Sequence, residues 1–132
     1  MALSKIQAES MNLADTYAFT GTVSGAGEDV GNVEAWVNFN GKNTVAIRDS
    51  ANVSSITDNG TGDYTVNFST AMADANYCVL IQSGEDTSGS HSNHIGANLH
   101  RSAPTTSACR VNTSSLNGSA VDHEFIFVGI IR

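Results

Sequence analysis

The sequence predicts an all-β fold, an antiparallel β-sandwich knob with an extended N-terminal arm. Segments with the two-residue alternation of strands recur about every ten residues, and Gly, Asn, Asp and Ser separate them. Only 14% of the 132 residues are charged, and no helical periodicity of ordinary length follows residue 20. A chain of this length forms about one domain, which we place at residues 31–132.

The first 30 residues differ from the rest and are interpreted as an attachment arm. Apolar residues recur near helical spacing up to residue 13, and two aromatic residues then follow at a spacing of two. The glycine-rich stretch 25–28 is typical of a hinge. The residues expected to dock the arm are Leu3, Ile6, Leu13, Tyr17 and Phe19. The alternative is that this segment forms the first strand of the sandwich.

The strands expected in the first part of the domain are 35–39, 44–48, 53–56, 64–68 and 76–82. The first two are joined through Asn40-Gly41, a dipeptide typical of tight hairpins because it tolerates the positive φ angles of a type I′ turn. Tyr64, Val66 and Phe68 share one face of their strand, and polar residues share the other. This alternation predicts a half-buried strand.

The later strands are expected at 94–99, 109–113 and 125–131, with a turn at 116–119. In the last strand both rows of side chains are apolar. Such a strand lies between two layers or has one face covered by another subunit, because exposed apolar rows are disfavoured. We therefore expect a homotrimer whose interface includes Leu80, Ile126, Val128 and Ile130.

The long segment 83–107 is the candidate receptor or partner loop, since long loops on a rigid scaffold often carry binding functions. Its many polar groups can form hydrogen bonds. It contains no Phe, Trp or Tyr, which argues against a carbohydrate site in particular. A disordered loop, or one packed on a neighbour, is the alternative. The candidate contact residues are Glu85, Asp86, His91, Asn93, His94, Asn98, His100 and Arg101.

Catalytic chemistry is not expected, and neither is a bound cofactor or metal. The histidines between residues 91 and 100 are the only ligand cluster, but a Ser/Gly loop gives them no rigid scaffold. The acidic pairs are Glu85 with Asp86 and Asp122 with Glu124. Acid catalysis needs one carboxyl with a raised pKa, and solvated acids in such a loop have nothing to raise it.

Charge and hydropathy exclude further classes of function. The net charge of −7 leaves too few cations to bind a nucleic-acid backbone. The chain has no run of about 18 apolar residues for membrane insertion. Its first residues, MALSKIQAES, do not resemble a secretory signal, so we expect synthesis and retention in a cytoplasm. Cys78 and Cys109 are then expected as free thiols, although one bridge stays open.

Two stretches carry a resemblance to a known family. One is SKIQAESMNLADTYAFTGTV at 4–23; the other, at 35–77, begins AWVNFNG and contains NVSSITDNGTGDYTVNF. They resemble the start and the C-terminal module of tail-fibre and related virion proteins of tailed bacteriophages, particularly those of marine and cyanobacterial hosts. The resemblance implies a trimeric β-sandwich knob whose variable loops contact a receptor. The motif residues Trp36, Phe39, Tyr64 and Phe68 are structural in this interpretation, belonging to the core and its turns.

The predicted function is that of a phage virion structural protein, a short tail-fibre-like receptor-binding protein for host attachment. It is made in the host cytoplasm and binds other virion proteins, of tail or capsid, through residues 1–30. A capsid decoration or head-fibre protein is the first alternative, because the chain lacks the long shaft of a fibre. A lectin-like carbohydrate-binding module is the second, and the missing export signal argues against it.

Overall fold

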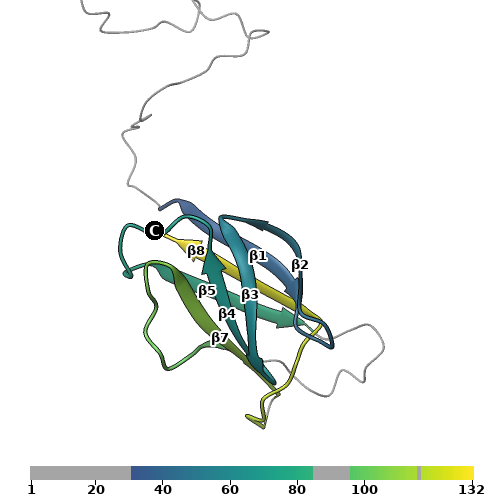
Figure 1. The fold of residues 1–132 in the computed structure, drawn as a ribbon. Helices are drawn as coiled ribbons and strands as arrows, with labels where there is room; N and C mark the ends of the chain where they lie inside the picture. The colour runs from purple at the N-terminus through teal and green to yellow at the C-terminus, as the bar shows by residue number, and fades with distance from the viewer. Residues whose placement is uncertain (1–30, 85–95, 116) are drawn as a thin grey trace, which may run out of the picture.

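Two four-stranded antiparallel sheets pack face to face in the computed structural model, which describes residues 31–84, 96–115 and 117–132 (Figure 1). Sheet A has the strand order β2-β1-β8-β5, and sheet B has the order β3-β4-β7-β6. The strands are β1 Val33–Asn40, β2 Ala46–Ala51, β3 Val53–Gly60, β4 Asp63–Phe68, β5 Cys78–Gly84, β6 Gly96–Leu99, β7 Ala108–Ser114 and β8 Phe125–Ile131. The predicted all-β sandwich is confirmed, and the described residues form no helix. The predicted arm, residues 1–30, lies outside the described residues.

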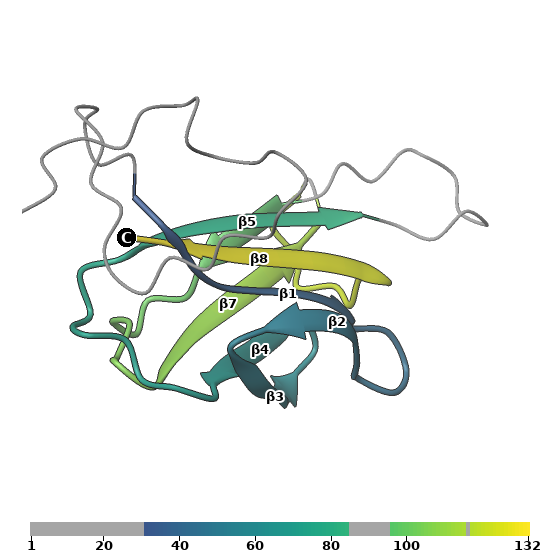
Figure 2. The same cartoon turned by 90° about the horizontal axis from the view of Figure 1, so that it is seen from above.

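The hydrophobic core fills the space between the two layers, which are seen from above in Figure 2. The predicted alternation of β4 is confirmed, because Tyr64, Val66 and Phe68 are buried while the residues between them are only half-buried. Aromatic rings meet edge to face, Phe39 with Tyr64 at 5.3 Å and Phe68 with Tyr77 at 5.8 Å between centroids. The apolar rows of both sheets therefore stabilise one continuous core.

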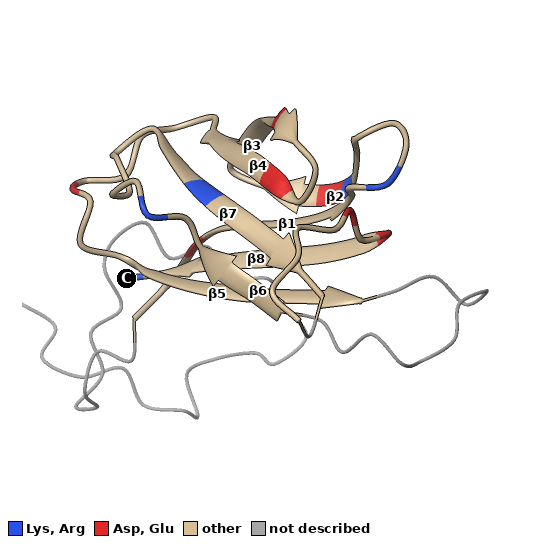
Figure 3. Ribbon diagram, turned by 90° about the horizontal axis from the view of Figure 1, so that it is seen from below, with Lys and Arg blue, Asp and Glu red and all other residues tan. Residues whose placement is uncertain are grey.

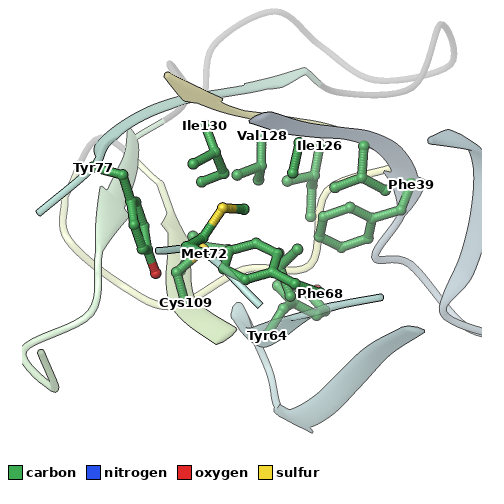
Figure 4. Packing of buried hydrophobic residues seen from close by; sticks show 13 residues of the cluster. Phe39, Tyr64, Phe68, Met72, Tyr77, Cys109, Ile126, Val128 and Ile130 are labelled. Atoms are coloured by element: carbon green, nitrogen blue, oxygen red, sulfur yellow. The ribbon is translucent and has the colours of Figure 1, made fainter. Parts of the chain in front are cut away.

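The last strand, β8, contributes to this core the row that was predicted to form the trimer interface. Ile126, Val128 and Ile130 are 0%, 3% and 1% exposed and point toward the residues of sheet B (Figure 4). Because β8 lies between β1 and β5 in sheet A, sheet B of the same chain covers its inner face. The interface prediction is wrong for these three side chains. Leu80, the fourth predicted residue, is 53% exposed on β5.

Trp36 is a second correction, since it was expected among the core and turn residues. Its neighbours Ala35 and Val37 point inward, so Trp36 points outward from sheet A and is 38% exposed. The other aromatic residues of the motif, Phe39 and Phe68 among them, are buried as expected.

The β1–β2 hairpin forms, but its turn is longer than the expected type I′ turn. Residues 41–45 connect the strands, and the left-handed residue is Asn43, with a φ of 61°. Gly41 is required for a different reason, because a Cβ there would lie 2.5 Å from the Tyr64 hydroxyl. That hydroxyl lies 3.0 Å from the Gly41 carbonyl oxygen. The glycine permits this close approach of side chain and backbone.

The bounds of β8 agree with the predicted ones, whereas most other boundaries shift by one to four residues. β5 begins at Cys78 rather than at 76, because the backbone N–H of Asn76 donates to Oδ1 of Asp74 (2.7 Å) in a turn that precedes the strand. Both cysteines are free thiols, as expected, with Cys78 exposed and Cys109 buried. Burial raises the pKa of Cys109 to about 12.

Candidate interaction surfaces

One end of the sandwich holds both the C-terminus and the point where residue 31 enters. The backbone N–H of Asn32 donates to the Arg132 carbonyl at 2.5 Å, and that of Arg132 donates back at 3.0 Å. The Arg132 guanidinium also pairs with Asp74 at 2.9 Å. We term this region the arm end, because residues 1–30 join the sandwich here (Figure 1).

The opposite, distal end receives both ends of the segment 85–95. Gly84, the last residue of β5, pairs with Phe125, the first residue of β8, whose other end leads to the C-terminus. Gly96 pairs with Ser114 at the end of β7, and the His123 ring lies 3.5 Å from the Ser114 carbonyl. Both attachment points of 85–95 therefore lie far along the strands from the arm end.

Buried Tyr64 connects the turns of the distal end. Its hydroxyl lies 2.6 Å from Oδ1 of Asp122, which also accepts the Gly62 N–H at 2.7 Å. Burial, and then the hydrogen bond to Asp122, raises the pKa of Tyr64 above its usual range. Glu124 instead pairs with Arg48 at 3.5 Å. The two carboxylates considered as an acid–base pair thus have separate structural partners.

The structure describes three of the eight candidate loop residues. Five lie outside the described residues, namely Glu85, Asp86, His91, Asn93 and His94. The described ones are Asn98 on β6, and His100 and Arg101 in the connection that leads to β7. That connection returns to the arm end, because the Thr106 carbonyl accepts the N–H of Met72, which lines a small pocket beside the C-terminus. The short strand β6 separates the two parts of 83–107.

The outer face of sheet B is polar, and its side chains bond to one another. Arg110 donates from Nε and Nη2 to both carboxylate oxygens of Asp63, at 2.7 and 2.5 Å. The bond from Arg110 lowers the pKa of Asp63. The Asn67 amide donates to the hydroxyls of Ser55 and Thr57. This face therefore suits contact with water, and its central charges are paired.

The outer face of sheet A has the opposite character. Trp36, Leu80 and Phe127 surround Gly129 in a groove of about 490 Å³. The strand register places Gly129 directly between Trp36 and Leu80, so its missing side chain forms the floor. We term this surface the outer groove. Sequence reasoning included Leu80 of this surface in the predicted interface but chose the opposite row of β8; the signal it overlooked is the row that contains Phe125 and Phe127.

No protein-family model, curated protein or solved structure matches this chain significantly. Among the described residues, no group of three or more His, Cys, Asp and Glu side chains is placed to hold a metal ion. The same part of the chain contains no helix that is long and apolar enough to cross a membrane.

Proposed function

We propose that this chain is a structural protein of a tailed-phage virion, a short tail-fibre-like module that binds a host receptor. Residues 1–30 attach it to the particle, and the sandwich forms a homotrimeric knob. The sequence stretches that resemble tail-fibre proteins support the proposal. The observation that carries it is the separation of the arm end, where residue 31 enters, from the distal end, where 85–95 is attached.

This separation is what an adhesion module requires. A knob held at one end presents its other end to solution, so a distal loop reaches a cell surface without obstructing attachment. β5 and β6 hold the two ends of 85–95 through the ladders with β8 and β7. The loop sequence can then vary while the scaffold stays constant. In a trimer, three weak contacts act together through their high effective concentration.

The test of receptor binding is loop replacement followed by adsorption of particles to host cells. Residues 85–95 are exchanged for Gly-Ser of equal length, and a control exchanges residues 102–104, which lie in the connection toward the arm end. We expect the distal replacement to abolish adsorption and the control to leave it unchanged. Unchanged adsorption in the distal variant would remove the receptor assignment from this loop.

Immunogold labelling of particles tests the place of attachment. Label on the tail supports the fibre-like protein, whereas label over the head identifies a capsid decoration protein. Deletion of residues 1–27 is the companion experiment, since the domain begins at the bonds between Asn32 and Arg132. We expect a folded knob that no longer joins the particle. Insoluble protein would show that the deleted residues belong to the sandwich.

A further inference from the structure

Exposed apolar side chains are concentrated on one part of the molecule. Of the six large hydrophobic residues that are well exposed among those described, four lie on β1, β5 and β8, namely Val33, Trp36, Leu80 and Phe127. Three of them line the outer groove. Contiguous apolar surface of this kind marks an interaction site in a folded protein.

We propose that other copies of this chain cover the outer groove, so that Trp36, Leu80 and Phe127 form the contact between subunits. The proposal rests on the homotrimer of the proposed function and names its interface. In this proposal the outer groove forms the subunit interface in place of the inner row of β8, because the core of each subunit already buries that row.

The distribution of charge favours a copy of the same chain as the occupant. Most of the chain's net charge of −7 lies in residues 1–30 and 85–95, so two sandwiches repel one another only weakly. The strands β1, β5 and β8 contain a single charged residue, Glu34, near the start of β1. In Figure 3 the ribbons of β5 and β8 are tan along their lengths, because neither strand contains a charged residue. Two copies of the outer groove therefore meet without charge repulsion, and the groove offers no charge complement to a strongly charged partner.

The register of the face suits a three-fold axis that runs along the strands. Two successive rows of paired residues run across this face from β1 through β8 to β5, namely Asn38–Phe127–Gln82 and Trp36–Gly129–Leu80. In copies related by such an axis, each row of one copy lies at the same position along the axis as the same row of the next copy. The three Phe127 rings then form one layer. In the next layer, the missing side chain of Gly129 leaves space for the indole and the leucine side chains.

The first test compares two leucine substitutions in the full-length chain by sedimentation and native mass measurement. Leu80→Glu places a carboxylate in the proposed contact, and Leu99→Glu places one on β6, where the leucine is 42% exposed. Burial of an unpaired charge is expected to raise the dissociation constant of the assembly roughly 100-fold or more for Leu80→Glu. Leu99→Glu should keep the mass of the wild type. Phe127→Ser is the second variant, used if circular dichroism shows Leu80→Glu to be unfolded.

The second test uses Cys78 as a natural probe of the same face. Cys78 precedes Leu80 by two residues, so both point to the same side of β5, and Cys109 is too deeply buried to react. Labelling by a maleimide should slow as the wild-type concentration rises through the dissociation constant. In Leu80→Glu the labelling should stay fast at every concentration.

The outcomes separate the interface from the proposed function. A trimer that persists in Leu80→Glu, or in Phe127→Ser where Leu80→Glu is unfolded, together with fast labelling of Cys78 in the wild type, overturns the interface and leaves the trimer intact. A monodisperse monomer at micromolar concentration overturns both. A monomer that protects Cys78 until residues 1–27 are deleted would assign the groove to the chain's own arm and would also overturn the proposal.

Discussion

Replacement of Tyr64 by Phe is expected to lower the free energy of unfolding by about 2 kcal/mol. The new ring keeps the core volume and the edge-to-face contact with Phe39, so the change is confined to the hydroxyl group. That hydroxyl is fully buried and makes its shorter contact, 2.6 Å, with the Asp122 carboxylate. A hydrogen bond to a charged group contributes roughly 1.5–3 kcal/mol. We expect the middle of this range because the Gly62 N–H still bonds the same carboxylate oxygen.

Urea and thermal unfolding of the full-length chain measure this loss. For a domain of about 100 residues, ~2 kcal/mol corresponds to a lowering of Tm by roughly 8–16 °C. Asp122→Asn is the control, because its amide oxygen keeps an acceptor for both donors, and it should cost less than Tyr64→Phe. A loss below about 0.5 kcal/mol, within the range of ordinary surface substitutions, would refute the role assigned to the hydroxyl.

Alkaline pH provides a further measure of the same group. The folded state raises the pKa of Tyr64 and therefore holds its proton more tightly than the unfolded chain, in which the phenol titrates near ~10. The stability that depends on this proton is complete below pH ~10 and is lost as the pH rises above it. Tyr64→Phe should reduce the steepness of that loss. Tyr77, whose pKa burial raises to about 12, retains its own contribution in the variant.

Three further substitutions test other parts of the fold. Gly62→Ala should destabilise the protein by at least ~2 kcal/mol in urea unfolding, because the position has a φ of +63° and its Cβ would collide with the Thr113 carbonyl. Val128→Ala should cost about 2 kcal/mol through a core cavity, while the folded protein keeps the subunit number of the wild type in sedimentation; a change in that number would return this row to the interface. Asp63 has a lowered pKa, so its bond to Arg110 stabilises the fold above pH ~4 and is lost as the pH falls. Asp63→Asn should flatten the acid unfolding curve by no more than ~1 kcal/mol, because the pair is partly exposed; an unchanged curve would contradict this.

The sequence predicts strands well where one face is buried and the other meets water. β4 is such a case, since its apolar and polar residues alternate without interruption. β8 is harder, because both of its rows are apolar and alternation alone does not show which row faces the core. The pairing with β1 decides it, since Ile126 pairs with Phe39 and Val128 with Val37, which are both buried. This pairing joins residues about ninety positions apart, and no local pattern contains it.

The candidate surfaces are less predictable than the strands. Residues 83–107 look like one loop in the sequence, but the four-residue strand β6 divides the segment between the two ends of the molecule. A strand this short offers too few residues for a clear alternation. The contact between Tyr64 and Asp122 joins residues 58 positions apart, with no motif to mark it. Sites that depend on the pairing of distant segments therefore require the structure.

Separate contacts stabilise the two ends of the sandwich, and this has a consequence for variation in the proposed adhesion module. The arm end depends on Asn32, Asp74 and Arg132, whereas the distal end depends on Tyr64 and Asp122. The two sets share no residue, so the changes in the free energy of unfolding caused by substitutions in one set should add to those caused by substitutions in the other. A distal loop can then change its sequence without weakening the attachment of the arm. The ladders of β5 with β8 and of β6 with β7 keep its two ends in place while it does so.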